Sequence, residues 1–347
     1  MMFKSKELIS GRLTAIVSVA AMLLFTFLLS GCEKANPTPT QAPPSGTPQT
    51  QVNQAADIAK TRVGSSIDAA IDLIRETPAF VRTSPVSYPY DRANLQYLAL
   101  TSEQQALYNE MLPKVKDMIP FEYTALEHGY DVLDNVLLAA YALCRDYPEY
   151  EIYFDIEDII EGDMTSALRS SYFLPYSPNT VPDSTDSIKK EVEIFEEECN
   201  LIVESIPEDF DAYDKYRYLA AVISLRTPYD NDFTGGFPTA TAYGAVEGDL
   251  AICQGYATGF EYLCRKANLW CTQVSGISGD ISHVWNLVKL ESGTYHVDVT
   301  WADSDGVVPL SPEWHINFMM TQDEILWDRE IVDGTVATGT YLLNSME

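Results

Sequence analysis

The chain contains 347 residues, of which 46% are hydrophobic and 21% are charged, enough for about two globular domains. Its formal net charge is −29, and its isoelectric point lies near 4.3. A chain this acidic repels nucleic acids and anionic lipid head groups, so we expect no nucleic-acid partner and no membrane attachment through basic patches.

The first 31 residues have the organisation of a secretion signal. Basic residues come before an apolar run from Leu13 to Leu28, and the tetrapeptide Leu29-Ser-Gly-Cys32 follows it. This pattern resembles a bacterial lipoprotein signal peptide over residues 1–31, in which Cys32 becomes the lipidated first residue. An uncleaved anchor is the alternative, although the run is short for a bilayer span. We expect a protein held at the extracytoplasmic face of the cell membrane by lipid on Cys32.

Residues 32–54 are rich in Pro, Thr and Gln and contain almost no large apolar side chain. Such a segment cannot bury a core, so it predicts a flexible tether. Residues 55–180 are expected to form a mostly helical N-terminal subdomain. A capping box at Ser102 and Gln105 predicts one helix, and the apolar pattern from Asp131 to Cys144 predicts another. No pattern in this subdomain indicates chemistry.

Residues 186–347 form the second predicted domain, and its first helix spans Ser187 to Ser205. Five glutamates lie along this helix: Glu191, Glu193, Glu196, Glu197 and Glu198. We interpret them as a solvated acidic face, because no histidine and no ligand spacing accompany them.

A second acidic feature partly imitates a calcium-binding loop. Asp230-Asn-Asp232 is followed by Gly235, but the twelfth position of the loop is Thr241, where a glutamate is expected. Turn chemistry explains the pattern better. The sequence therefore predicts no metal site.

A helix is predicted to begin at Cys253. The apolar residues Tyr256, Phe260, Leu263 and Cys264 follow with helical spacing. The thiol therefore lies at the helix N-terminus, where unpaired N–H groups and the helix dipole favour the thiolate, the reactive form. The same N–H groups are placed to stabilise an oxyanion during acyl transfer.

A β-prone segment and the two strands of a hairpin are predicted after this helix. Leu269 to Val274 is β-prone, and Gly276 to Ser282 reads as a turn-rich loop. His283 to Leu290 and Thr294 to Trp301 then alternate as the two strands of a hairpin.

The hairpin places a histidine and an aspartate on one face. With a two-residue turn at Ser292-Gly293, the alternation puts His283 and Asp298 on the same side. The same register sets Ala302 opposite His283 and leaves Asp298 roughly 13 Å along the partner strand. A bulge, a strong twist or a different pairing must close that gap.

Other residues compete for these roles. His296 shares the face of Asp298, and we interpret it as a strand residue. Four further cysteines show no spacing typical of a disulfide framework, and pairing among them is left open: Cys144, Cys199, Cys264 and Cys271. We interpret the last two as small buried hydrophobic residues.

Three motifs together resemble the transglutaminase-like core domain, a papain-like α+β fold. They are Cys253-Gln-Gly-Tyr-Ala257, His283-Val-Trp-Asn286 and Val297-Asp-Val-Thr-Trp301. The resemblance covers the chain from about Tyr213 to Asp328. It implies an α+β fold in which the helix bearing the cysteine packs on an antiparallel sheet, here preceded by the helical subdomain.

The resemblance also implies roles for individual residues. Cys253 would be the nucleophile, His283 the general base and acid, and Asp298 the carboxylate that orients the histidine. Weaker matches suggest oxyanion or substrate-wall roles for Tyr243, Gln254 and Trp301. Neither a cofactor nor a metal is required.

These observations predict an extracytoplasmic thiol enzyme that acts on peptide or carboxamide bonds through a thioester. Its substrate would be a peptide or protein, including one associated with the cell wall. Hydrolysis by a protease or amidase is favoured over amine transfer by a cross-linking transglutaminase. The alternative is a non-catalytic surface lipoprotein that keeps the fold and binds peptide or wall polymer. In a third possibility, the helical part binds a partner that the core then processes.

Overall fold

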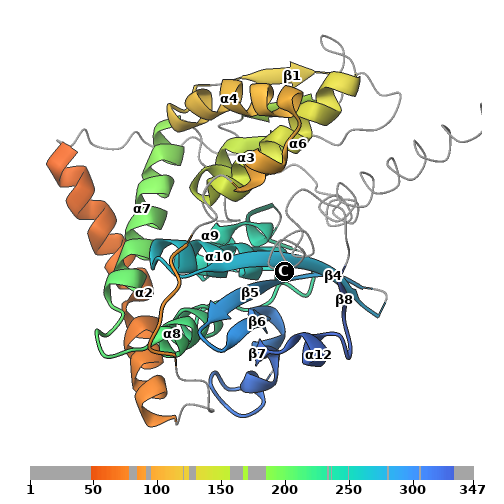
Figure 1. Ribbon diagram of the computed structural model, residues 1–347. Coiled ribbons are helices and arrows are strands. Elements are labelled where there is room, and N and C mark those ends of the chain that lie inside the picture. The colour runs from red at the N-terminus through yellow and green to blue at the C-terminus, as the bar shows by residue number, and fades with distance from the viewer. Residues whose placement is uncertain are drawn as a thin grey trace, which may run out of the picture.

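The computed structural model describes residues 48–77, 84–90, 95–119, 121–124, 130–156, 167–170, 185–232, 234–235, 237–248, 250–279, 281–304 and 306–331. The predicted signal peptide and Cys32 lie outside these residues. Within the described part of the chain, no helix combines the length and the apolar character needed to cross a membrane. The fold is α+β, with helices packed around an antiparallel sheet of five strands (Figure 1).

The first described helix, α2, begins inside the predicted tether. It spans Pro48–Glu76, so the last residues of the predicted tether are helical. Proline is well tolerated in the first turn of a helix, where its missing N–H has no helical partner to lose. Ala55, Ala59 and Val63 are buried at a spacing of four residues, which gives α2 one face to pack. That face contacts helices α7 (Thr185–Glu204) and α8 (Ala212–Ser224).

The remaining N-terminal elements form a second layer, at the top of Figure 1. The helices are α3 (Leu95–Ala99), α4 (Ser102–Lys116), α6 (Tyr130–Asp146) and the 3₁₀ segment η1 (Pro148–Tyr153). Three short strands, which the sequence did not indicate, pair in the order β1-β3-β2: β1 (Glu122–Thr124), β2 (Phe154–Ile156) and β3 (Ala167–Ser170). The capping box of α4 uses Thr101 and Gln104, one residue earlier than predicted.

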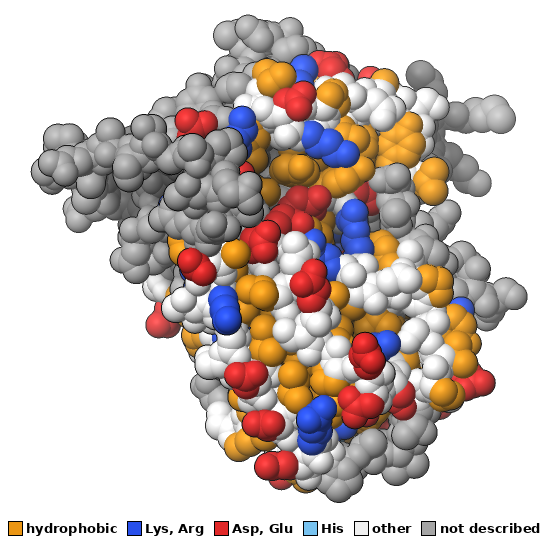
Figure 2. All heavy atoms as spheres, turned by 90° about the vertical axis from the view of Figure 1, so that its left-hand side faces the viewer, with side chains coloured by type: hydrophobic (Ala, Val, Ile, Leu, Met, Phe, Trp, Pro, Cys, Tyr) orange, Lys and Arg blue, Asp and Glu red, His pale blue; other side chains and the backbone are white. Residues whose placement is uncertain are grey.

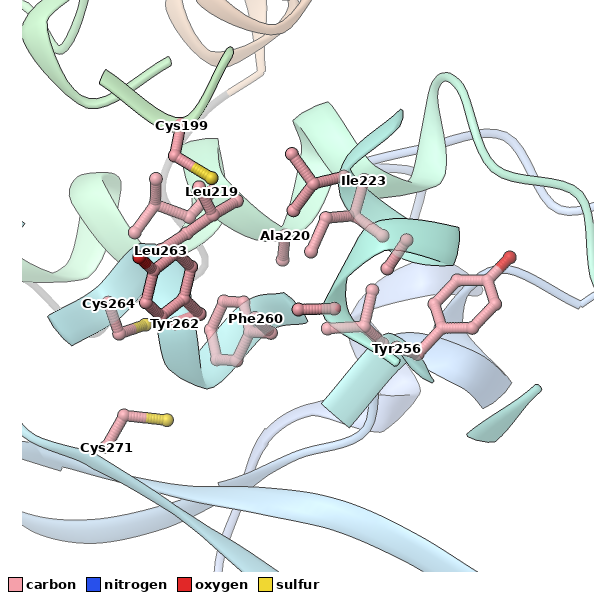
Figure 3. Close-up of a cluster of buried hydrophobic side chains, with 14 of the residues drawn as sticks. Cys199, Leu219, Ala220, Ile223, Tyr256, Phe260, Tyr262, Leu263, Cys264 and Cys271 are labelled. Carbon is pink, nitrogen blue, oxygen red and sulfur yellow. The ribbon is translucent and has the colours of Figure 1, made fainter. Parts of the chain in front are cut away.

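Helix α10 (Cys253–Lys266) lies at the centre of the molecule. It contacts α7, α8 and α9 (Ala242–Glu247), and the strands of the larger sheet lie on its other side. Phe260 and Leu263 of α10 pack in the same apolar cluster as Leu219 and Ile223 of α8 (Figure 3). This core continues through α2, α4 and α6, so one hydrophobic core joins the two predicted domains.

The larger sheet has the strand order β7-β6-β5-β4-β8, and all of its neighbouring strands are antiparallel. The strands are β4 (Cys271–Ser278), β5 (Ile281–Leu290), β6 (Gly293–Val297), β7 (Phe318–Met320) and β8 (Glu330–Ile331). The short helices α11 (Val299–Ala302) and α12 (Gln322–Ile325), with the 3₁₀ segments η2 (Phe237–Ala240) and η3 (Trp314–Asn317), complete the fold. Gln273 and Asn286 hydrogen-bond to α10, so α10 covers their face of the sheet.

The predicted loop from Gly276 to Ser282 is wrong, because most of it is strand. β4 continues to Ser278, and β5 begins at Ile281. Gly276 belongs in the strand for a steric reason. A Cβ atom there would lie 2.3 Å from the carbonyl oxygen of Glu330 and 2.4 Å from the ring of Trp285. The glycine thus marks a close approach of backbone and ring inside the sheet.

The predicted solvated acidic face of α7 is also wrong in part. The side chain of Glu198 is fully buried, and it lies 3.3 Å from Arg62 of α2 and 3.8 Å from Arg226. Burial raises the pKa of Glu198 to about 7, although the two arginines act in the opposite direction. The two basic partners come from distant parts of the chain, so the periodicity of α7 could not reveal them. On the face of the molecule that includes α2 and α7, acidic, basic and apolar side chains are interspersed (Figure 2).

The first turn of α10 depends on a glycine. A Cβ atom at Gly255 would lie 2.2 Å from the carbonyl oxygen of Thr239, whereas one at Gly64 in α2 would meet nothing within 4 Å. We expect Gly255→Ala to lower the free energy of unfolding by about 1–3 kcal/mol, since the backbone must move to accept the methyl group. The matched Gly64→Ala should raise it by about 0.5–1 kcal/mol through helix propensity. Urea unfolding followed by circular dichroism measures both; equal effects of the two substitutions would contradict the close packing.

Candidate active site

Cys253 is the first residue of α10, as its sequence context predicted. The first hydrogen bond of the helix runs from the Tyr256 N–H to the carbonyl of Ile252, at 3.1 Å. The N–H groups of the three preceding residues therefore lie outside the hydrogen-bond ladder of α10 and point out of its N-terminus. The cysteine is partly exposed, unlike the other described cysteines, which are buried. Its thiol is thus accessible at the positive end of a helix dipole.

His283 and Asp298 are in direct contact. Nε2 of His283 lies 2.7 Å from Oδ2 of Asp298, and both side chains are almost completely buried. The Cys253 side chain also interacts with the imidazole. Because Asp298 occupies Nε2, Nδ1 is the nitrogen left for the thiol. The structure therefore brings together the three residues that the sequence singled out.

The register of the hairpin differs from the predicted one by two residues. The turn consists of Glu291 and Ser292, and Leu290 pairs with Gly293. Continued one residue beyond β6, this pairing sets Asp298 opposite Trp285, only two residues from His283. Such diagonal neighbours lie within reach of long side chains. The chain then leaves the sheet, because Asp298 caps α11 and the predicted strand to Trp301 is helical at its end.

Asp298 accepts hydrogen bonds from three different segments. Besides His283, the Trp301 N–H donates to Oδ1 at 3.1 Å, and Nη2 of Arg329 donates to Oδ2 at 2.9 Å. Burial alone would raise the pKa of Asp298, but His283, Arg329 and the Trp301 N–H hold it below its ordinary value. The carboxylate therefore stays ionised inside the protein.

The pKa values of the two histidines in this region are shifted in opposite directions. Burial alone would lower the pKa of His283, but the charge and hydrogen bond of Asp298, together with Cys253, raise it to about 10. Among the described residues no carboxylate pairs with His296, and burial lowers its pKa to about 4. Nδ1 of His296 accepts the indole N–H of Trp285 at 2.9 Å, so Nε2 carries the proton and donates to Gln322 at 3.0 Å. His296 is a neutral structural residue, consistent with its interpretation as a strand residue.

The three weaker site predictions have different outcomes. Trp301 flanks the imidazole, with its ring centroid 5.3 Å from that of His283. Tyr243 is completely buried, stacks on Phe195 at 3.9 Å and donates its hydroxyl to the Glu149 carbonyl, so it does not line the site. The side-chain amide of Gln254 donates to Thr258 and Gln273, both at 2.9 Å. Both of its N–H groups are engaged, so this amide is not an oxyanion donor.

Sequence reasoning missed Tyr229. Its backbone forms a parallel bridge with Ala251, two residues before the thiol. Its hydroxyl interacts with the backbone of Cys253, and its ring stacks on that of Tyr256 at 6.3 Å. Burial and the nearby thiol raise the pKa of Tyr229 to about 12, so its hydroxyl keeps its proton. Tyr229 lies in no periodic pattern, and no local signal in the sequence points it toward Cys253.

The acidic loop after Tyr229 is a turn, as predicted. Asp230 is buried and accepts the N–H groups of Thr234 at 3.0 Å and Gly235 at 2.9 Å. Its oxygens are therefore used by the backbone of its own loop. Among the described residues, no three His, Cys, Asp or Glu side chains are grouped so that they could hold a metal ion.

The four remaining described cysteines are buried and reduced. Cys264 of α10 and Cys271 at the start of β4 lie near each other (Figure 3), and their thiols interact. Burial raises the pKa of all four thiols: Cys144, Cys199, Cys264 and Cys271.

No protein-family model matches the chain. One segment of 61 aligned residues is 39% identical to the kyphoscoliosis peptidase of Mus musculus, and the human protein of that name matches equally well. The match covers 14% of this chain and 9% of each peptidase, so this chain spans only a small part of the length of these relatives.

The two imidazoles should titrate far apart. We expect His283 to remain protonated up to about pH 10 and His296 to remain neutral down to about pH 4. Histidine-selective ¹⁵N NMR measures both values, and the four histidines of the chain make assignment by single substitution practical. Two ordinary values near 6.5 would contradict the charge pairing described above.

Proposed function

We propose that this protein is a thiol enzyme that cleaves peptide or carboxamide bonds with Cys253, His283 and Asp298. The observation that carries the proposal is the 2.7 Å contact of the histidine with a fully buried carboxylate, beside a partly exposed cysteine at a helix N-terminus. The short match to proteins named as peptidases agrees with this class of reaction. We further propose a papain-like, transglutaminase-related core and attachment to the outer face of the membrane through lipid on Cys32.

The proposed reaction begins from an ion pair in which the proton of the Cys253 thiol already resides on Nδ1 of His283, in keeping with the raised pKa of that imidazole. Asp298 stabilises the resulting imidazolium through Nε2. Sγ then attacks the substrate carbonyl, and the C–S bond forms as the carbonyl oxygen becomes an oxyanion. The N–H groups at the start of α10 are oriented to stabilise that oxyanion. Nδ1 returns its proton to the leaving nitrogen as the C–N bond breaks, which leaves a thioester.

The second half of the reaction decides the class of enzyme. Water, deprotonated by the now neutral His283, would attack the thioester and release a carboxylic acid and the thiolate, with the proton remaining on His283. A primary amine would instead form a new amide. We propose hydrolysis, and therefore a protease or amidase acting on a peptide or protein substrate. No cofactor enters either step.

The thiol should be selectively reactive at mildly acidic pH. We expect Cys253 to react with iodoacetamide at pH 6 faster than the buried cysteines, because the imidazolium of His283 stabilises the thiolate. His283→Ala should slow this reaction by roughly tenfold or more. The matched His296→Gln should leave it unchanged, since His296 is neutral. Peptide-resolved mass spectrometry of the full-length chain gives each rate.

Equal alkylation of Cys253 in the wild type and in His283→Ala would refute the thiolate–imidazolium pair. A non-catalytic surface binding protein would then be the better interpretation. If the pair is present, incubation with casein and a primary-amine probe separates the two reactions. Hydrolysis yields new peptide termini, whereas transfer adds the mass of the probe.

Tyr229 should contribute to the rate. Its hydroxyl lies against the Cys253 backbone, where the oxyanion would form, and it can donate one further hydrogen bond. We expect Tyr229→Phe to lower kcat by about 10²-fold with little change in KM, as for the loss of one oxyanion donor. The control is Tyr243→Phe, which removes a hydroxyl group that lies buried in the core. It should lower stability but not kcat, and similar kcat values for both variants would exclude the donor role.

A further inference from the structure

Arg329 is a buried cation that the three-residue mechanism does not use. It lies between α12 and β8, and its side chain is only 1% exposed. A buried guanidinium is costly unless charged partners and hydrogen bonds compensate its lost hydration. Its contacts therefore show what holds this charge beside the candidate site.

The guanidinium binds the same carboxylate oxygen as the histidine. Nη2 donates to Oδ2 of Asp298 at 2.9 Å, and Nε2 of His283 approaches that oxygen to 2.7 Å. Nη2 also donates to Oδ1 of Asn317 at 2.9 Å, and the Asn317 carbonyl accepts the Asp298 N–H at 2.9 Å. Asp298 is thus fixed through both its side chain and its backbone.

Arg329 also contacts the two tryptophan rings that lie beside His283. Its guanidinium carbon lies 4.1 Å from the ring centroid of Trp301, a cation–π distance, and 6.0 Å from that of Trp285. Both rings lie next to His283, with centroid separations of 5.3 Å and 5.8 Å. One side chain therefore contacts the carboxylate and both rings that surround the imidazole.

Arg329 has a second acidic partner, which is exposed to solvent, unlike Asp298. Nη1 lies 2.7 Å from Oδ1 of Asp328, whose side chain is 45% exposed. Water screens that pair, so its electrostatic contribution is small. The side chain of Asp298 is 0% exposed, so its interaction with Arg329 is screened far less. The groups that determine the charge around His283 are therefore Cys253, Asp298 and Arg329, with neutral His296 and Tyr229 nearby.

We propose that Arg329 is a positioning residue of the triad, which fixes Asp298 and offsets its negative charge so that His283 can release its proton to the leaving group. This inference rests on the proposed function. A histidine beside an uncompensated buried carboxylate would hold its proton too strongly to act as a general acid. With Arg329 present, a thiolate, an imidazolium, a carboxylate and a guanidinium sum to zero net charge.

The two possible effects of Arg329 predict opposite shifts. If the arginine only holds Asp298 in place, its removal lets the carboxylate move away, and the pKa of His283 falls toward 6.5. If its charge offsets that of Asp298, removal strengthens the attraction between Asp298 and the imidazolium, and the pKa rises. The pKa of His296 should rise in both cases, because the charge of Arg329 lowers it in the native protein. His296 therefore reports that the substitution acted on a folded site.

The experiment is a histidine-selective ¹⁵N NMR titration of the full-length chain carrying Cys253→Ala. This background removes the thiol, which itself raises the pKa of His283. Arg329→Gln is compared with Arg329→Lys, which keeps the charge, and with Asp328→Asn, which removes only the exposed partner. We expect Arg329→Gln to raise the pKa of His283 by roughly one unit. The two controls should leave it within about 0.3 unit of the background value.

A fall or no change in the pKa of His283 in folded Arg329→Gln would overturn the proposal. If that variant does not fold, Arg329→Lys decides. The proposal is supported if Arg329→Lys retains the pKa of His283 in the Cys253→Ala background and lowers kcat in the chain that keeps Cys253. A fall of the pKa of His283 toward 6.5 overturns it. The titration needs no substrate and no thiol. Failure to find hydrolysis would therefore refute the proposed function without deciding the charge balance around Asp298.

Discussion

The candidate site depends on keeping one carboxylate ionised in the interior of the protein. Asp298 is completely buried, and an isolated charge there would be strongly unfavourable. Its hydrogen bonds compensate for the lost water, and they come from a strand, a short helix and the segment between α12 and β8. The orientation of the imidazole, the cap of α11 and the placement of Trp301 all follow from this one group. The five-stranded sheet and α10 serve to bring those segments to it.

Local patterns in the sequence predicted the parts of the site that are themselves local. The helical spacing after Cys253 placed the thiol at the start of α10, and strand alternation put His283 and Asp298 on one face. The distance between the two could not be predicted, because it depended on which residues form the turn. A turn one residue earlier moves every pair by two, since both strands shift together. The end of β6 at Val297 could not be predicted for another reason. The residues around Asp298 have a strand-like pattern, but Asp298 caps the short helix α11.

Contacts between distant segments were beyond sequence reasoning. Tyr229 precedes the three site residues in the chain, and Arg329 follows them. Neither lies in a periodic pattern that predicts its contact with the site. The same holds for Glu198. In the sequence it is one of several glutamates on a helix, but in the structure it is buried beside Arg62 and Arg226. A net charge of −29 describes the whole chain, but it does not show which carboxylates are buried with a cation. Only tertiary structure distinguishes them.

The position of Arg329 along the chain has a consequence for maturation. A chain that is made or exported from its N-terminus presents Cys253 first, then His283 and Asp298, and Arg329 only near the end of the described residues. Until that last segment docks, Asp298 lacks its only described cationic side-chain partner besides the histidine, and its burial is unfavourable. The assembled set of charges around Asp298 is therefore complete only after the segment that follows α12 has docked.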